Sequence, residues 1–226
     1  MKTFKFLPAL LVPTFLVPTV AFAQPETTES GAPFSHHVAP ADRAFEVSIG
    51  TGYTQGVGEL GEGMTDLQDL AGPGGAANLE LGYRIIPNLT LGAYGSFARY
   101  SKGDSLADDT SVLAASAGIQ AAWHVLPDRS VDPWVSLGAG WNALWLDPDQ
   151  GKATALQGFD LARLQVGVDY RISPEVAISP VIGGALGMFV AEDSTMTSDY
   201  NEIQGKKVNF TGFAGIAGRF DLGGRR

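Results

Sequence analysis

Residues 135–145 read VSLGAGWNALW, and this stretch determines the fold class. Its odd-numbered positions are apolar or aromatic, and the positions between them are small or polar as far as Asn142. Successive side chains of a β-strand point to opposite sides, so this alternation predicts a strand with one apolar face.

The same period of two recurs seven more times along the chain. The other stretches lie near residues 44–56, 75–86, 89–101, 111–125, 157–172, 175–191 and 207–222. No helical pattern separates them. Eight such strands predict an all-β fold, a closed antiparallel up-and-down barrel.

The connections between these stretches alternate in length. Residues 57–74, 102–110, 147–155 and 192–206 form long, acidic, glycine-rich connections, whereas the links near 86–88, 126–132 and 173–175 are short. Long loops at one end and short turns at the other are typical of transmembrane barrels. We therefore expect an eight-stranded antiparallel transmembrane barrel over residues 44–222.

The first residues have the pattern of a targeting segment. Lys2 and Lys5 precede an apolar stretch, which ends in Ala21-Phe22-Ala23. This pattern predicts a secretory signal peptide over residues 1–23. Residues 24–43 are interpreted as a flexible periplasmic leader, in which His36 and His37 are solvated rather than metal-binding, and residues 223–226 as a short C-terminal tail.

Composition excludes several functional classes. The 226 residues include no cysteine, which excludes a disulfide scaffold, a cysteine zinc site and a catalytic thiol. The formal charge is −9, so nucleic acid is not an expected partner, because phosphate binding needs clustered Lys and Arg. No cofactor is predicted.

Aromatic residues of the apolar face gather at two levels, which favours a face turned toward lipid. Two aromatic girdles are typical of a protein that spans both interfaces of a bilayer. One predicted girdle lies near the short turns and the other near the long loops; they contain Phe45, Tyr83, Trp123, Tyr170 and Phe220, and Tyr53, Phe97, Trp145 and Phe210.

The opposite face carries charges of both signs in mid-strand. An eight-stranded barrel is just wide enough for its lumen to be filled by side chains, and an unpaired charge there is costly. We therefore expect a charge network that plugs the lumen, with Glu46 and either Arg84 or Arg219 as its surest contact. The predicted network contains Glu46, Glu80, Arg84, Arg163, Asp169 and Arg219.

The final strand, which ends at Gly218-Arg219-Phe220, resembles the C-terminal targeting signal of outer-membrane barrels. With the architecture of residues 44–222, the chain resembles the small eight-stranded barrels of the OmpA, OmpX and OmpW kind, although the tail after Phe220 departs from their usual aromatic end. The resemblance implies a cell outer membrane location and contact with the barrel assembly machinery, membrane lipids and lipopolysaccharide. The expected protein is a monomer.

The resemblance leaves three functions open. The first is a structural, envelope-integrity or adhesive role; the second is a narrow channel for small hydrophobic solutes, as in OmpW-type proteins. The third, an enzyme that modifies lipid A, is disfavoured because His124 and Ser116 lie eight residues apart on one predicted strand, too far apart to hydrogen-bond. We therefore expect no enzyme activity.

Overall fold

The computed structural model describes residues 43–149, 153–194 and 200–224. The predicted signal peptide, nearly all of the predicted leader and the last two residues lie outside this part of the chain. Among the described residues, no helix is long and apolar enough to cross a membrane.

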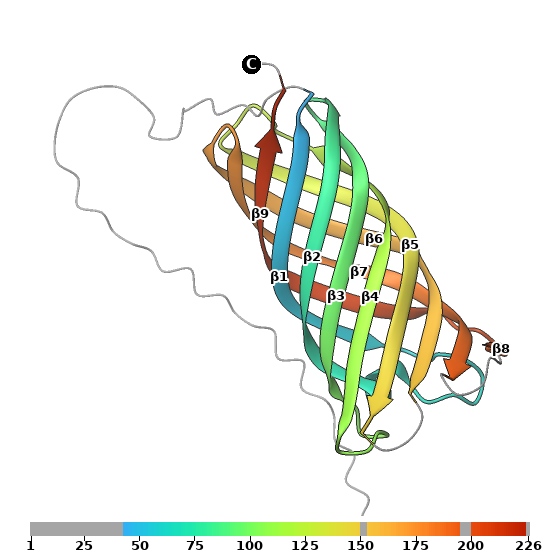
Figure 1. The fold of residues 1–226 in the computed structure, drawn as a ribbon. Coiled ribbons are helices and arrows are strands. Elements are labelled where there is room, and N and C mark those ends of the chain that lie inside the picture. Colours follow the sequence, from blue (N-terminus) through green and yellow to red (C-terminus); the bar gives the residue numbers. More distant parts are fainter. Residues whose placement is uncertain (1–42, 150–152, 195–199, 225–226) are drawn as a thin grey trace, which may run out of the picture. The chain divides into compact units, whose positions relative to one another are not determined.

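The described residues form a closed barrel of eight antiparallel strands (Figure 1). Each of the eight barrel strands pairs with the barrel strand that precedes or follows it along the chain, and the pairing of the first strand with the last closes the circle. A short ninth strand, just before the last one in sequence, pairs only with the strand that precedes it. The elements are β1 (Phe45–Val57), α1 (Leu67–Leu70), β2 (Ala71–Ile86), β3 (Leu89–Lys102), β4 (Thr110–His124), β5 (Val131–Pro148), β6 (Thr154–Ser173), β7 (Val176–Ser194), β8 (Tyr200–Glu202) and β9 (Asn209–Leu222). The predicted fold class is confirmed.

Strands at the long-loop end extend further than the sequence pattern indicates. β2 begins at Ala71, inside the stretch predicted as a loop, and β8 pairs with the end of β7 at residues 191–193. Beyond the lipid-facing band the alternation of apolar side chains is lost, but backbone pairing continues, so periodicity alone misses these extensions. The short α1 also lies in a predicted loop.

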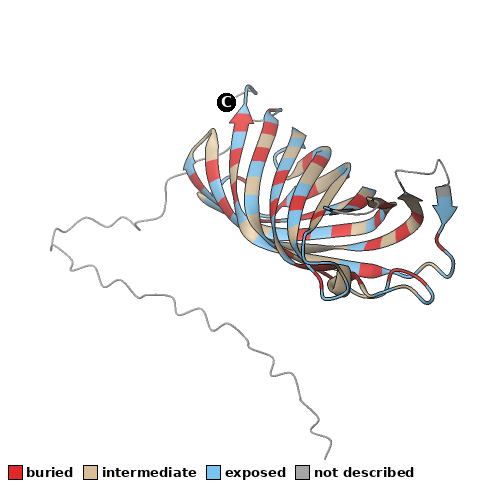
Figure 2. Ribbon diagram, turned by 60° about the horizontal axis from the view of Figure 1, so that its bottom comes forward, coloured by how far each residue is buried: buried red, intermediate tan, exposed pale blue. Residues whose placement is uncertain are grey.

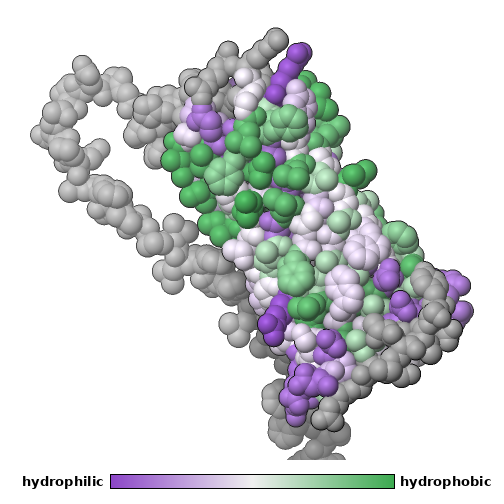
Figure 3. All heavy atoms as spheres, in the orientation of Figure 1, coloured by the Kyte–Doolittle hydropathy of each residue, from purple (hydrophilic) through white to green (hydrophobic). Residues whose placement is uncertain are grey.

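The apolar face of the strands points outward. Ile119 and Leu137 are 74% and 60% exposed, whereas Glu46 and Arg84 on the opposite face are 5% and 0% exposed. Figure 2 shows this alternation of buried and exposed residues along the strands, and Figure 3 shows hydrophobic residues gathered on the visible outer face. A soluble monomer rarely exposes so continuous an apolar surface, so the outer face fits a lipid environment.

A β-bulge in β6 changes which residues face the lumen. The register of β6 with β7 shifts between Asp160 and Ala162, and that of β5 with β6 shifts between Gly138 and Gly140. A bulge adds one residue to a strand and so reverses the alternation beyond it. Asp160 and Arg163 consequently both point inward, although their numbers differ in parity, and both are more than nine-tenths buried.

Tyr94 of β3 lies inside the barrel over glycines of β4 and β5. A Cβ atom at Gly118 would lie 2.7 Å from Cε1 of Tyr94 and 2.2 Å from the carbonyl oxygen of Ala139. At Gly75 the nearest atom would be 3.9 Å away. Glycine at position 118 therefore leaves the space that the tyrosine ring and the adjacent strand occupy.

We predict that Gly118→Ala destabilises the barrel by about 1–3 kcal/mol, because the added methyl group displaces the strand backbone or the ring of Tyr94. The same change at Gly75 adds the methyl group where it meets only ordinary contacts. Urea unfolding in lipid vesicles compares the two variants. Equal stability of both would contradict the close packing around Tyr94.

Candidate functional site

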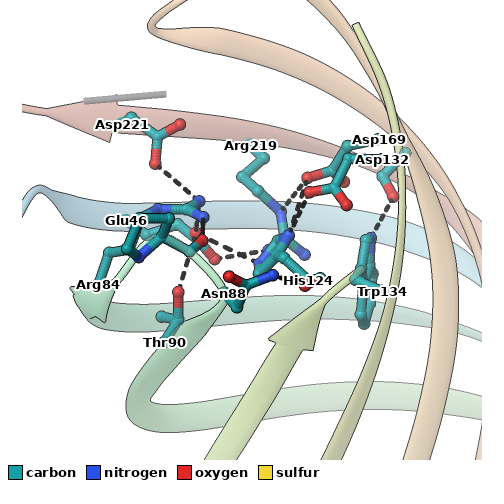
Figure 4. Close-up of polar contacts among 12 residues, drawn as sticks. Glu46, Arg84, Asn88, Thr90, His124, Asp132, Trp134, Asp169, Arg219 and Asp221 are labelled. Carbon is teal, nitrogen blue, oxygen red and sulfur yellow. Dashed lines mark hydrogen bonds and ion pairs between the residues drawn. The ribbon is translucent and has the colours of Figure 1, made fainter. Parts of the chain in front are cut away.

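Eight ionisable side chains meet inside the barrel near the short turns (Figure 4). All eight are at most 7% exposed, and they come from β1, β2, β4, β5, β6 and β9. We call this group the lumen charge cluster; it consists of Glu46, Arg84, His124, Asp132, Asp169, Arg171, Arg219 and Asp221.

Glu46 is the acceptor at the centre of the cluster. Its Oε2 accepts a hydrogen bond from Nη2 of Arg84 at 2.7 Å, and its Oε1 accepts one from Nη1 of Arg219 at 2.6 Å. Thr90 of β3 lies 3.4 Å from the same Oε2. Because charge-assisted bonds of this length are stronger than neutral ones, Glu46 links three strands across one end of the lumen.

Asp221 joins a second pair of arginines. Its Oδ2 accepts a hydrogen bond from Nη1 of Arg171 at 2.7 Å, and its Oδ1 lies 3.4 Å from Nη2 of Arg84. Arg84 also donates to the carbonyl oxygen of Pro87 at 2.9 Å. The cluster is thus tied to the turn between β2 and β3.

The contacts of His124 determine which ring nitrogen carries its proton. Nε2 lies 3.2 Å from Nη1 of Arg219, and Nδ1 lies 2.7 Å from Oδ2 of Asp132. A guanidinium group can only donate, so Nε2 accepts and Nδ1 donates to the carboxylate. These contacts assign the neutral Nδ1–H form of the imidazole.

Arg219 has a further contact with an aromatic ring. Its guanidinium carbon lies 4.5 Å from the ring centroid of Trp134, and Nε1 of Trp134 donates to Oγ of Ser179 on β7 at 3.0 Å. Nε of Arg219 lies 3.4 Å from Oδ2 of Asp169. With Thr90 and Ser179, side chains from all eight barrel strands meet at this level.

Four of the six residues of the predicted network, Glu46, Arg84, Asp169 and Arg219, lie in the cluster. Glu80 and Arg163 do not: neither belongs to an ion pair among the described residues. Nη2 of Arg163 donates to Oδ1 of Asn78 at 3.2 Å, and its guanidinium carbon lies 4.4 Å from the ring centroid of Tyr94.

Sequence reasoning missed the other half of the cluster, which consists of His124, Asp132, Arg171 and Asp221. Arg171 and Asp221 follow Asp169 and Arg219 at a spacing of two, so the alternation already placed them on the same face. His124 and Asp132 flank a short turn, where the pattern ends. Their side-chain contact depends on the strand register, in which His124 of β4 lies opposite Trp134 of β5, and the sequence alone does not give this register.

A second group of buried side chains lies inside the barrel toward the long-loop end. It comprises buried side chains from the strands and from the loops, and we call it the apolar plug: Leu60, Leu67, Ala71, Val112, Leu144, Leu146, Leu156, Phe189 and Ile203. The prediction that residues 57–74 and 192–206 form long, acidic connections is therefore incomplete. Glu59, Glu62 and Glu202 are exposed, while Leu60, Leu67 and Ile203 pack inside the barrel.

Backbone hydrogen bonds hold these loop segments in place. The amide of Leu67 donates to the carbonyl of Gly58 at 2.8 Å, and the amide of Ile203 donates to the carbonyl of Val190 at 3.0 Å.

Ion pairs lie on the outer surface of the loops. Lys207 forms an ion pair with Glu59. Between β3 and β4, the hydrogen bond from Lys102 lowers the pKa of Asp108 below its ordinary value.

A cavity of about 100 Å³ lies between the apolar plug and the lumen charge cluster. Its walls include Ala76, Ala98 and Phe213, and its polar lining includes Asp160 and Arg163. The carboxylate of Asp160 accepts hydrogen bonds from Tyr94 at 3.1 Å and from Asn142 at 2.8 Å. The space is large enough for several water molecules.

The nine predicted girdle residues all lie on the outer face, each between 37% and 64% exposed. Phe45 and Tyr83 are directly paired across β1 and β2, with ring centroids 5.2 Å apart. Trp123 pairs with Leu89 at the same end of the barrel. Their assignment to bilayer interfaces remains a prediction.

No protein-family model matches the chain, and no curated protein sequence matches it. Among solved structures, the chain is similar to Neisserial surface protein A, with a TM-score of 0.56 and 16% identity over 79% of this chain and 97% of that one. It also matches Ail, the attachment invasion locus protein of Yersinia pestis (TM-score 0.44, 15% identity, 79% and 99% covered). A third match is the outer membrane protein OprG of Pseudomonas aeruginosa (TM-score 0.45, 8% identity, 80% and 98% covered).

The similarity to Neisserial surface protein A agrees with the strand order, the closure and the outward apolar face described above. The chain has the fold of the small eight-stranded outer-membrane β-barrels.

Proposed function

We propose that the protein is a monomeric, integral protein of the bacterial outer membrane that acts as a closed barrel in a structural, envelope-integrity or adhesive role. The observation that carries this proposal is that buried side chains occupy the lumen toward both of its ends. The lumen charge cluster fills the short-turn end with residues that are at most 7% exposed, and the apolar plug fills the other end with residues that are at most 9% exposed.

Both closures are held by contacts that resist opening. In the lumen charge cluster, removing one partner leaves an uncompensated buried charge. In the apolar plug, Leu60 is fully buried and Leu156 is 2% exposed, so moving the loops outward would expose these side chains to water. Ions therefore meet a barrier at each end.

The partners that we propose follow from the outer face of the barrel, its final strand and its acidic loops. The outer face contacts membrane lipids, and the final strand, which ends near Phe220, contacts the barrel assembly machinery. The four predicted long loops carry 13 acidic residues and three lysines, a net charge of −10. Divalent cations that bridge such loops to lipopolysaccharide phosphates support an envelope-integrity role.

We expect the protein to fractionate with outer membranes and to migrate differently on a denaturing gel before and after boiling. A closed barrel with every strand paired resists detergent until it is heated. Membrane fractionation combined with the unboiled gel checks both points. Recovery as a soluble periplasmic protein that migrates identically in both lanes would overturn the proposal.

The alternative function is a narrow channel for small hydrophobic solutes. The cavity of about 100 Å³ supports it, because alanine and phenylalanine side chains form part of its wall. The alternative requires the apolar plug to open, since Leu67 and Phe189 line the cavity on that side. Uptake of a small hydrophobic solute by vesicles that contain the barrel, and not by empty vesicles, would favour it.

We propose that the barrel is not an enzyme. Both ring nitrogens of His124 are engaged, one by Asp132 and the other by Arg219, so the imidazole has no free nitrogen for a nucleophile. Ser116 lies on the same strand as His124 but eight residues away, and its Oγ lies 2.7 Å from Oγ of Ser96. This arrangement does not support a serine nucleophile activated by histidine.

A further inference from the structure

Asp169 is a buried carboxylate with too few partners. It is 0% exposed, and neither of its oxygens accepts a hydrogen bond among the described residues. Oδ2 lies 3.4 Å from Nε of Arg219, but Oδ1 has neither a hydrogen bond nor an ion pair. A buried polar atom without a partner is rare in folded proteins and calls for an additional ligand.

Two further ligand atoms lie beside this carboxylate. Nδ1 of His124 is 4.0 Å from Oδ2 of Asp169 and 2.7 Å from Oδ2 of Asp132. The three atoms all lie within 4.8 Å of one another. With metal–ligand bonds of about 2.0–2.2 Å, two ligands of one ion lie roughly 3–4 Å apart, so small side-chain shifts would bring all three to one centre.

The charge inside the barrel favours a divalent cation. Six carboxylates face the lumen, those of Glu46, Glu80, Asp132, Asp160, Asp169 and Asp221, and four guanidinium groups oppose them, those of Arg84, Arg163, Arg171 and Arg219. With His124 neutral, the lumen has an excess of two negative charges. An uncompensated charge in such an enclosed space is costly, and one divalent ion would balance it.

We propose that His124, Asp132 and Asp169 form a binding site for one divalent transition-metal ion, of which Zn²⁺ is the probe of choice. One imidazole nitrogen and two carboxylate oxygens are ligands that suit zinc, and a water molecule would complete four-coordination. The site lies in the lumen charge cluster and goes beyond the proposed function, because a closed barrel needs no metal.

Metal binding requires one local rearrangement. Nδ1 of His124 releases its proton to bind the ion, and the neutral imidazole then carries its proton on Nε2. The guanidinium group of Arg219, whose Nη1 lies 3.2 Å from Nε2, then turns away from that nitrogen while it keeps its 2.6 Å bond to Oε1 of Glu46. Oε2 of Glu46 lies 3.9 Å from Nε2, and a small shift brings it within hydrogen-bond distance as the acceptor. A metal-bound histidine typically donates its second nitrogen to a carboxylate in this way.

The test uses the full barrel, refolded in detergent, treated with a chelator and then titrated with Zn²⁺ alone. We expect one zinc ion per barrel above any contribution of His36 and His37, which are retained in every variant. Asp169→Asn should weaken this binding at least about tenfold, since even indirect partners of metal ligands change affinity by that factor. Asp108→Asn is the matched control: it removes the same charge from an exposed carboxylate on the loop between β3 and β4, outside the lumen, and should leave the binding unchanged.

The unboiled gel verifies that each variant is folded, and His124→Gln replaces Asp169→Asn if the latter is not. The proposal is overturned if the wild-type barrel binds no zinc, or if Asp169→Asn and His124→Gln bind it as the wild type does. It is also overturned if infrared spectroscopy of the metal-free and zinc-treated barrel shows the same protonated carboxyl band, absent in Asp169→Asn. A proton would then supply the missing partner.

Discussion

Arg219→Ala is expected to lower the free energy of unfolding of the barrel by about 3–5 kcal/mol, which is the usual cost of removing one member of a buried ion pair. Arg219 is 1% exposed, and it contacts Glu46, His124, Asp169 and the ring of Trp134. Its loss leaves the central carboxylate with Arg84 as its remaining arginine partner.

Urea unfolding in lipid vesicles measures this effect, and Lys207→Ala provides the control. Lys207 also forms an ion pair, with Glu59, but both side chains are about half exposed to solvent. Exposed pairs contribute little to stability, so the control should unfold as the wild type does. Similar losses in the two variants would show that the buried pair is not a strong contact.

Ile119→Arg is expected to destabilise the inserted barrel by about 2–4 kcal/mol, the cost of arginine on the lipid face near the bilayer midplane. Ile119 is 74% exposed, and it lies on β4 between the level of Trp123 and the level where Ala115 pairs with Phe97. A charged side chain at this position must be transferred from water into the hydrocarbon region of the bilayer.

Val125→Arg is the matched control because it places the same charge on the outer surface beside Trp123, near the short turns. Arginine close to the interface costs only about 0–1 kcal/mol. Unfolding in lipid vesicles should therefore separate the two variants. If Ile119→Arg were as stable as Val125→Arg, the outer face would not be buried in lipid.

The architecture follows from the sequence because alternation reports directly which residues share a face. In residues 135–145 the aromatic side chains at Trp141 and Trp145 indicate one outward surface, and the structure exposes both. The contact of Glu46 with Arg84 and Arg219 also follows, since these residues lie on neighbouring strands of a closed barrel. The number of strands and the contacts of Glu46 were therefore predictable.

Three features depended on information that periodicity does not contain. The bulge in β6 turns Asp160 inward, where it binds Tyr94 and Asn142, against the parity of the strand. The apolar plug forms because Leu60 and Leu67 enter the barrel from a segment with many acidic residues. The hydrogen bond between His124 and Asp132 depends on the conformation of the short turn between β4 and β5.

The central claim is that the lumen is closed, and single-channel recording of the refolded barrel in planar lipid bilayers tests it most directly. We predict a bilayer current indistinguishable from that of a protein-free membrane, because the lumen charge cluster and the apolar plug block both ends. Stable, repeated conductance steps from the wild-type barrel would contradict the account and favour the channel.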